Sequence, residues 1–315
     1  EGNLPVYFMA TKKVTIYDIL GFKEKDLIKM ANSVNAHYLS FPIKKSSGKT
    51  RWIDAPDDEL KAVQKAILYK FLYKFEPHKK AYGFVKNRNV KDGANLHKKA
   101  KILISMDLKD FFNSIKITRV KKCMLYLFNR YKKINPNFKC DVADANIIAT
   151  LLTYFDQVPQ GAPTSPALAN LICIGLDYKL ENFSKREGYT YHRYADDVNF
   201  SRKTKTTKNP KNLVQEIETI ARSCGFKINY KKTRITRQNR RMKVTGVVVN
   251  EKLSVERWRW RNFKAKLHNL KRDGETISTK EYQQLRGWIE WMRLLNPTRG
   301  KKFLKQLGEI PLRSS

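Results

Sequence analysis

Two adjacent aspartates, Asp196 and Asp197, lie in the middle of a run in which aromatic and polar residues alternate, from Tyr191 to Ser201. Alternation with a period of two is typical of β-strands, so the run predicts a hairpin with the acidic pair at its turn. Neighbouring carboxylates repel each other, and we therefore expect a fold that holds them on a rigid turn to neutralise them with a cation. The alternative for an isolated Asp-Asp pair is a solvated turn, and the rest of the sequence decides between the two.

A third carboxylate, Asp107, ends an apolar run that begins at Lys101 and reads as a buried strand. An acid at the exposed end of such a strand is a frequent catalytic placement, although structural aspartates cap turns there as well. With Asp196 and Asp197 it gives three carboxylates from two neighbouring strands. Such a set can share two Mg²⁺ ions about 3.5–4 Å apart, an arrangement used for in-line phosphoryl transfer.

The charge of the chain indicates a polyanionic partner. Its 315 residues include 64 Lys and Arg against 29 Asp and Glu, a formal net charge of +35. The excess is spread along the sequence, which is typical of a protein with a large basic surface for nucleic acid. A membrane surface is the alternative, but the sequence has no long apolar run and no signal-peptide pattern. We therefore expect no membrane partner and a cytoplasmic location.

Hydrophobic periodicity predicts a series of helices separated by short extended segments. The expected helices cover residues 23–39, Asp57 or Asp58 to about 75, 117–134, 141–155, Ser165 to about 185, and 213–224. In the fifth of these, Ser165 is expected to be the N-cap and Pro166 the first helical residue. Residues 226–233 and 242–249 read as further β-rich runs.

Two basic or glycine-containing segments suit phosphate groups. Residues 41–56 predict a hairpin in which Lys49 and Arg51 point to the same face, where a guanidinium suits a triphosphate. The alternative is a solvated edge strand protected by its charge. Residues 157–166 form a loop, fixed by prolines and a glycine, that leads into a helix N-terminus and can receive phosphate.

From about residue 254 the chain becomes helical, basic and rich in tryptophan, and we place a boundary near 252. Arg257, Arg259 and Arg261 alternate with tryptophans and can grip a nucleic-acid backbone and its bases. Trp288 and Trp291, three residues apart, are instead expected to pack the helices together.

Three motifs occur in the order of the palm motifs of reverse transcriptases, and they resemble them closely. They are Asp107-x-x-x-x-Phe112, the run Pro159 to Pro166 (PQGAPTSP), and Tyr194-Ala195-Asp196-Asp197. Each motif is weak alone, but the ordered set is specific. The resemblance covers about residues 40 to 250.

Within that family the chain most resembles the bacterial retron reverse transcriptases. Val244-Thr245-Gly246 matches the Val-Thr-Gly motif that follows their palm. The run from Gly93 to His97 (GANLH) resembles their Asn-Ala-x-x-His motif, with glycine at the position where asparagine is expected.

The resemblance implies an α+β fold with a right-hand polymerase architecture: fingers, a palm formed by an antiparallel sheet with helices on one face, and a helical thumb. We assign residues 11–100 to the N-terminal helix and fingers, 101–250 to the palm with part of the fingers at 115–158, and 251–315 to the basic thumb. The first eight residues, before Met9, look like a leftover of recombinant expression, and residues 1–10 are assigned to this leader.

The resemblance also implies roles in catalysis. Asp107, Asp196 and Asp197 would be the catalytic ligands of two Mg²⁺ ions, and Phe112 would be the steric gate that excludes a ribose 2′-hydroxyl. The other positions expected to contact the incoming deoxynucleotide are Gln160 at the nucleotide itself and, at its phosphates, Lys49, Arg51, and Lys231 or Lys232.

Further positions are expected to contact RNA or the primer. Val244, Thr245 and Gly246 correspond to the region that steadies the primer end, and Arg257, Arg259 and Arg261 would grip an RNA stem-loop. His97 belongs to the RNA- and primer-binding set through its motif, whereas a lone histidine in such a place is commonly a packing or hydrogen-bonding residue.

The implied function is RNA-directed DNA polymerisation in a retron. Such an enzyme copies part of a structured noncoding RNA from deoxynucleotides, starts from the 2′-hydroxyl of a guanosine, and leaves RNA-linked DNA (msDNA). The family works in antiphage defence, and because the chain is short, an effector is expected to be a separate protein. The alternatives are another stand-alone bacterial reverse transcriptase, from an intron, a diversity-generating element or a different defence system, and a non-catalytic RNA-binding scaffold.

Overall fold

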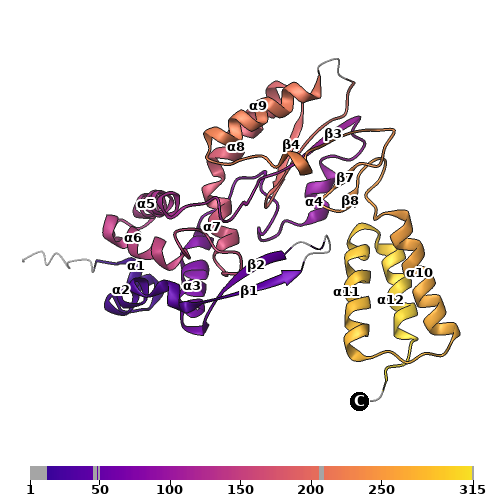
Figure 1. Cartoon of the computed structure of the whole chain (residues 1–315), viewed down its shortest axis with the longest axis horizontal. Helices are drawn as coiled ribbons and strands as arrows, with labels where there is room; N and C mark the ends of the chain where they lie inside the picture. The colour runs from indigo at the N-terminus through magenta and orange to yellow at the C-terminus, as the bar shows by residue number, and fades with distance from the viewer. Residues whose placement is uncertain (1–12, 45–47, 49, 206–208, 314–315) are drawn as a thin grey trace, which may run out of the picture. The chain divides into compact units, whose positions relative to one another are not determined.

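The chain folds into two units, each built from separate stretches of the sequence (Figure 1). The structure is a computed structural model that describes residues 13–44, 48, 50–205 and 209–313. Unit 1 comprises Glu1–Lys79, Lys109–Tyr178 and Cys224–Phe226, and unit 2 comprises Lys80–Leu108, Lys179–Ser223 and Lys227–Ser315. The leader predicted for residues 1–10 and the predicted phosphate ligand Lys49 lie outside the described residues.

Unit 1 combines one hairpin with helices. Strand β1 (Tyr38–Lys44) pairs with β2 (Thr50–Pro56) in antiparallel register. The helical elements are α1 (Ile16–Leu20), α2 (Glu24–Asn32), the 3-10 helix η1 (Val34–His37), α3 (Asp58–Lys70), the 3-10 helix η2 (Leu72–Lys74), α5 (Ile117–Ile134), α6 (Val142–Leu151) and α7 (Ser165–Ile172). Aromatic rings fill the core, because Phe71, Phe128 and Phe138 are almost completely buried and their rings contact one another.

Four predicted helices differ from the structure in their ends. The helix expected to about residue 75 ends at Lys70, and the one expected over 141–155 covers Val142–Leu151. The helix expected over 23–39 ends at Asn32, and from Tyr38 the backbone belongs to β1 because its hydrogen-bonding groups pair with β2. The helix expected from Ser165 to 185 is divided into α7 and α8 (Ile174–Arg186). Ser165 is not its N-cap, because its hydroxyl instead donates to the Pro159 carbonyl at 2.7 Å and closes the preceding loop.

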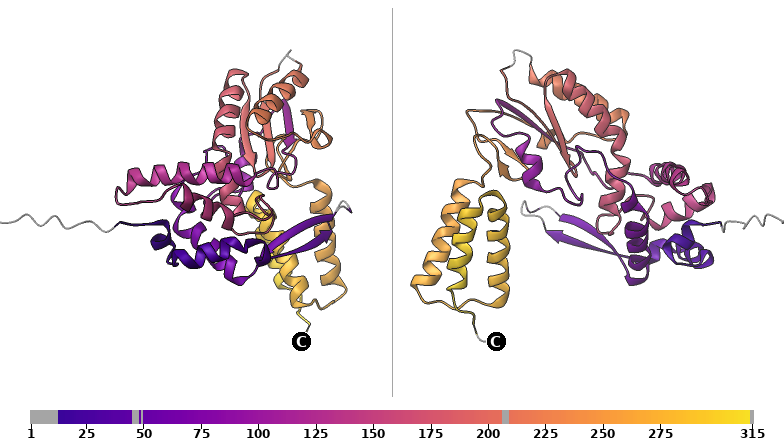
Figure 2. Two further views of the ribbon diagram at one scale, coloured as in Figure 1. Left: turned by 60° about the vertical axis from the view of Figure 1, so that its left-hand side comes forward. Right: turned by 180° about the vertical axis from the view of Figure 1, so that it is seen from behind.

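Unit 2 is built around a four-stranded antiparallel sheet with the strand order β4-β5-β3-β6. These strands are β4 (Thr190–Tyr194), β5 (Asp197–Arg202), β3 (Ile102–Asp107) and β6 (Arg234–Arg237). The figures show α8 and α9 (Pro210–Ser223) beside the sheet (Figures 1 and 2). β3 is buried along almost its whole length, so it forms the centre of this unit.

The C-terminal part of unit 2 is a bundle of three helices, α10 (Arg257–Arg272), α11 (Thr279–Leu295) and α12 (Pro297–Gly308). Its buried core is continuous with the sheet, because it forms one cluster with Leu103 of β3 and with the small hairpin of β7 (Lys243–Val244) and β8 (Val247–Val248). The remaining elements of unit 2 are α4 (Val90–Asn95) and the 3-10 helix η3 (Tyr230–Lys232).

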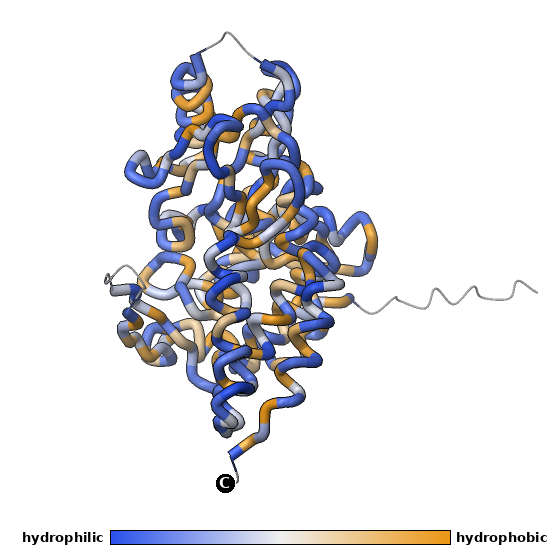
Figure 3. Tube along the Cα trace, turned by 90° about the vertical axis from the view of Figure 1, so that its right-hand side faces the viewer, coloured by the Kyte–Doolittle hydropathy of each residue, from blue (hydrophilic) through white to orange (hydrophobic). Residues whose placement is uncertain are grey.

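Antiparallel sheets and separate helices confirm the expected α+β class. Hydrophilic and hydrophobic positions are interspersed along the chain (Figure 3). In the described part of the sequence, no helix has both the length and the apolar character needed to cross a bilayer.

Candidate active site

The acidic pair lies where the sequence predicted it, on the tight turn between β4 and β5. Tyr194 and Asp197 are opposite each other in the ladder, so Ala195 and Asp196 form a two-residue loop. Ala195 has a φ of 54°, a left-handed conformation that costs a residue with a β-carbon about 1–3 kcal/mol. The surrounding structure therefore has to hold this turn in place.

Two contacts hold it. The completely buried Arg193 donates from Nη1 to the Ala195 carbonyl at 3.0 Å. Gly83 lies so close that a β-carbon there would be 2.6 Å from the Ala195 nitrogen. The Arg193 hydrogen bond and the close packing of the Gly83 backbone therefore together fix the conformation of the turn.

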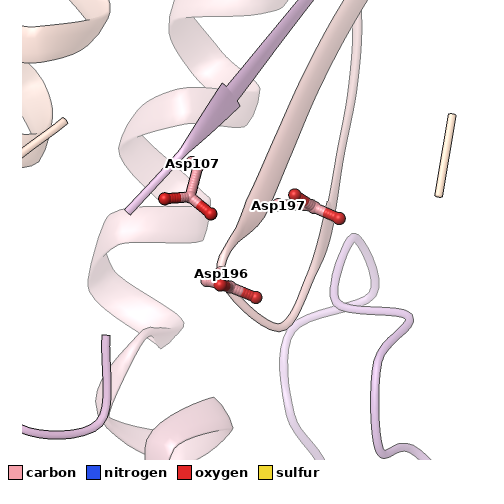
Figure 4. A group of neighbouring side chains, drawn as sticks. All are labelled: Asp107, Asp196 and Asp197. Atoms are coloured by element: carbon pink, nitrogen blue, oxygen red, sulfur yellow. The ribbon is translucent and has the colours of Figure 1, made fainter. Parts of the chain in front are cut away.

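The structure brings the third acid to the same place. Asp107 is directly opposite Asp197 in the register of β3 and β5, and the Leu108 amide donates to the Asp196 carbonyl at 2.9 Å. One ligand oxygen from each of the three aspartates lies within 4.8 Å of the others (Figure 4). Within the described part of the chain, this is the one group of three such side chains that could hold a metal ion.

The carboxylates carry more negative charge than their surroundings neutralise. Burial, followed by the charges of Asp196 and Asp107, raises the pKa of Asp197 to about 6. Burial and the charge of Asp107 also raise the pKa of Asp196. Both shifts mean that the cluster favours a bound cation or proton over three free charges, which is the chemistry expected of a divalent metal site.

Lys232 and Asn229 complete the cluster around Asp107. Lys232 Nζ lies 2.7 Å from Asp107 Oδ2, and this hydrogen bond raises the pKa of Lys232. Asn229 donates its side-chain amide to Asp107 Oδ1 at 3.1 Å and its backbone amide to the Asp107 carbonyl at 2.8 Å. Lys231, the other lysine considered from the sequence, is exposed.

The strand predicted over residues 226–233 is wrong, and Asn229 explains why. Its double hydrogen bond to Asp107 fixes the chain at that point, and η3 follows it at once. The regular ladder with β3 starts only at Arg234. The sequence held no signal for Asn229, because its contact partner is more than a hundred residues away.

Three of the residues predicted to bind the nucleotide, Arg51, Phe112 and Gln160, belong to unit 1, whereas Lys231 and Lys232 belong to unit 2. In unit 1 the three segments that carry them lie together. The Asp54 amide of β2, the strand that carries Arg51, donates to the Gln160 carbonyl at 2.8 Å. Gln160 donates from Nε2 to Asn113 Oδ1 at 3.3 Å, next to Phe112. These contacts place Arg51, Phe112 and Gln160 on neighbouring segments.

Gly161 is required where these segments meet. It has a φ of 143°, and a β-carbon there would lie 2.6 Å from the Asp54 carbonyl oxygen. The close approach of this loop to β2 therefore depends on glycine.

His97 is completely buried and is hydrogen-bonded within unit 2. Its Nδ1 lies 2.6 Å from Ser201 Oγ, and its Nε2 lies 2.6 Å from Nδ1 of the equally buried His192. Burial lowers the pKa of His97 well below its usual value, and burial with the charge of Lys80 lowers that of His192 to about 3. Both imidazoles are therefore neutral at physiological pH, and the His97 ring has no surface to offer to RNA.

The glycine that departs from the expected motif is explained by this histidine pair. A β-carbon at Gly93 would lie 3.0 Å from Cδ2 and from Nε2 of the His192 ring. His192 thus occupies the space that a side chain at position 93 would need.

The remaining predicted contact residues belong to unit 2, and all but the buried Val244 reach its surface at least in part. Val244-Thr245-Gly246 forms the β7–β8 turn, with φ values of 48° at Thr245 and 82° at Gly246. Arg257 and Arg261 are exposed on α10, and Arg259 is partly buried beside them. Trp291 packs against the core of the bundle as predicted, whereas Trp288 contacts Arg259 of α10 but remains 48% exposed.

Comparisons with known proteins agree with these observations. The sequence model of the family described as reverse transcriptase (RNA-dependent DNA polymerase) matches residues 43–249. The Retron Mx162 reverse transcriptase of Myxococcus xanthus is 32% identical over 297 residues, which cover 87% of this chain and 61% of that protein. The Retron Ec73 reverse transcriptase of Escherichia coli is 32% identical over 265 residues, which cover 81% of this chain and 82% of that protein.

The chain spans less than two thirds of the two Myxococcus relatives, 61% of Mx162 and 64% of the Retron Mx65 reverse transcriptase. Among solved structures, the telomerase of Candida albicans in complex with a fragment of telomeric RNA matches with a TM-score of 0.48 and 14% identity. That match covers 82% of this chain and 53% of the telomerase.

Proposed function

Because this chain belongs to the reverse transcriptase family, and within it to the retron enzymes, we propose that it is an RNA-directed DNA polymerase that copies a structured noncoding RNA. The observation that carries the proposal is the convergence of Asp107, Asp196 and Asp197 within 4.8 Å of one another. A binding scaffold would gain nothing from three mutually repelling acids at one point, so their presence together favours an enzyme.

The cluster fits two Mg²⁺ ions. The three carboxylates supply hard oxygen ligands, and the raised pKa values of Asp196 and Asp197 show that their charge is under-compensated. Bound there, the ions would activate a primer hydroxyl and neutralise the charge that develops on the triphosphate and on departing pyrophosphate.

The protein's own groups orient the carboxylates and the substrate. Asn229 fixes the rotamer of Asp107 through its side-chain amide. Lys232, whose ammonium lies at the edge of the cluster, binds the phosphates of the incoming nucleotide and serves as an acid for the leaving pyrophosphate.

The segments of unit 1 supply nucleotide selection. Arg51 binds the triphosphate with a guanidinium that can make two parallel hydrogen bonds to phosphate oxygens. Phe112 excludes a 2′-hydroxyl by size, and Gln160, fixed to Asn113, lies against the nucleotide. Lys49 assists at the phosphates.

The retron relatives support a more specific version of the proposal. In it, the enzyme starts synthesis from a 2′-hydroxyl of its RNA, produces msDNA, and acts in the cytoplasm in antiphage defence with a separate effector protein. In the same scheme, residues 11–100 with 115–158 form the fingers, 101–250 the palm and 251–315 the thumb. The Val244-Thr245-Gly246 turn then steadies the primer end, and Arg257, Arg259 and Arg261 bind RNA.

One experiment tests this proposal against its alternatives. The nucleic acid that copurifies with the protein is sequenced and treated with a debranching nuclease. A 2′,5′-branched RNA–DNA species is the expected result. Unbranched cDNA would indicate another stand-alone bacterial reverse transcriptase, and RNA alone, with no deoxynucleotide incorporation after Mg²⁺ is added, would indicate a scaffold.

A further inference from the structure

The helical bundle carries an aromatic pocket that the polymerase site does not use. It lies between α10 and α11 and has a volume of about 330 Å³, within the range of small-ligand pockets. We call it the tryptophan pocket; its main lining residues are Trp258, Arg259, Phe263, Gln284, Trp288 and Trp291.

Two indole rings are open to solvent around one cation. Trp258 is 51% and Trp288 48% exposed. The Arg259 guanidinium lies 5.1 Å from the Trp258 ring centre and 5.4 Å from that of Trp288. Large aromatic faces left in water cost hydrophobic free energy, and a pair of them beside an arginine is typical of a surface that receives a planar partner.

The arginine is held in place before any ligand arrives. Arg259 Nε donates to Oε2 of the buried Glu256 at 3.3 Å. Arg241 and Lys243 bind the other oxygen of the same carboxylate at 3.0 and 3.4 Å. A guanidinium anchored in this way loses little conformational entropy when a ligand binds beside it.

The pocket opens toward the turn that the retron motif identifies. A second cavity of about 450 Å³ shares Arg259, Trp288 and Trp291 with it and reaches Lys243 and Gly246 of the β7–β8 hairpin. The aromatic surface is therefore continuous with the Val244-Thr245-Gly246 turn.

The charge around the pocket decides which kind of molecule occupies it. Residues 251–315 contain sixteen lysines and arginines and seven acids. Glu281, the acid at the rim, is already paired with Lys266 at 2.8 Å. A polyanion that also offers flat aromatic groups satisfies both the charge and the indole faces, and nucleic acid has these properties.

We infer that the tryptophan pocket binds one unpaired nucleobase of the RNA, stacked on Trp288 beside Arg259, with the Gln284 amide at the base edge. This rests on the proposed function only in requiring that the protein binds RNA. It assigns Trp258 and Trp288 a role in binding. The bundle would then recognise an unpaired base of the RNA in addition to the charge of its phosphate backbone.

The test uses two short single-stranded oligoribonucleotides that differ at one position, one with 2-aminopurine and the other with an abasic site. Stacking on an aromatic residue is worth a factor of about 5 to 150 in the dissociation constant. The wild-type protein should bind the 2-aminopurine probe more tightly by such a factor and quench its fluorescence. Trp288→Ala should remove both the preference and the quenching, and Trp288→Phe should keep most of each.

Tyr126→Ala on α5, which removes an aromatic residue of similar exposure (53%) in unit 1, is the matched control and should behave as wild type. Equal binding of the two probes by the wild type, or equal quenching by Trp288→Ala, would overturn the inference. The assay contains neither Mg²⁺ nor deoxynucleotides. If the protein shows no preference for the 2-aminopurine probe but still extends a primer, the inference about the pocket is rejected and the proposed function stands. If the protein quenches the probe but extends no primer, the proposed function is rejected and the pocket stands.

Discussion

Lys232 Nζ lies 2.7 Å from Asp107 Oδ2, so this lysine forms an ion pair with a carboxylate that a metal ion would also need as a ligand. The ammonium neutralises part of the cluster's charge, and a metal ion has to compete with it. The strength of metal binding and the position of this lysine are therefore linked.

Lys232→Ala should strengthen metal binding and weaken catalysis. Removing an ion pair in which the lysine is 61% exposed frees Asp107 and should raise the affinity for Mn²⁺ by about two- to fivefold, measured by calorimetry. The rate of deoxynucleotide incorporation should fall, because the group proposed to bind the phosphates is lost. Lys231→Ala is the matched control, and an unchanged Mn²⁺ affinity in Lys232→Ala would show that the pair does not compete with metal.

Asp196→Asn and Asp197→Asn should each abolish Mg²⁺-dependent incorporation on an RNA template, by at least about 100-fold, because an amide is a poor ligand for Mg²⁺. RNA affinity should remain within about twofold, measured by fluorescence anisotropy. Asp26→Asn, at an exposed acid on α2, controls for the change in charge. Full activity in either variant would disprove the metal assignment.

The free energy of unfolding should depend on pH through Asp197. Its pKa is raised to about 6 in the folded protein from 3.8, so between these values the folded state binds a proton that the unfolded state has released. Protonation of Asp197 therefore contributes to the free energy of unfolding below about pH 4, and this contribution is lost as the pH rises through 6. It amounts to about 1–3 kcal/mol.

The measurement is urea unfolding of wild type and Asp197→Asn in EDTA between pH 4 and 8. The variant should gain stability relative to wild type as pH rises through this window. Added Mg²⁺ should stabilise only the wild type at pH 7.5. A difference between the two proteins that does not change with pH would contradict the raised pKa.

Phe112→Ala should admit ribonucleotides. If the ring excludes the 2′-hydroxyl, its removal should reduce the discrimination between deoxynucleotides and ribonucleotides by about 10- to 100-fold, measured as a ratio of kcat/KM values. Phe155→Ala, which removes an exposed ring elsewhere in unit 1, should leave the ratio unchanged. If wild type and Phe112→Ala discriminate equally between deoxynucleotides and ribonucleotides, Phe112 is not the steric gate.

Gly93→Asn, which restores the residue expected in the motif, should destabilise this protein by about 1–3 kcal/mol because the new side chain meets the His192 ring. In a His192→Ala background the same change should cost much less. A double-mutant cycle from urea denaturation measures the coupling, and additive effects would show that Gly93 is not needed to accommodate His192.

The sequence predicted elements whose pattern is local. The helix expected over 117–134 is observed as Ile117–Ile134. It could be predicted because the spacing of its apolar residues and the residues at its ends all lie within that one stretch of sequence. The acidic turn was predicted for the same reason, since the strands on both sides alternate up to it.

Features that depend on distant partners escaped prediction. The run after Phe226 alternates like a strand, but Asn229 is held by Asp107 and the chain turns. Trp288 and Trp291 have the spacing of packed neighbours, yet spacing does not say which ring faces the core, and the structure leaves Trp288 exposed. The division into two units likewise joins segments that are far apart in the sequence.

Gly83 has no side chain to take part in any reaction, yet it bounds the space available to the acidic turn from more than a hundred positions earlier in the chain. A single added methyl group there would lie 2.6 Å from the Ala195 nitrogen, so the backbone that carries Asp196 and Asp197 would have to shift. The accuracy with which the acidic turn is positioned thus depends partly on a residue that carries no reactive group.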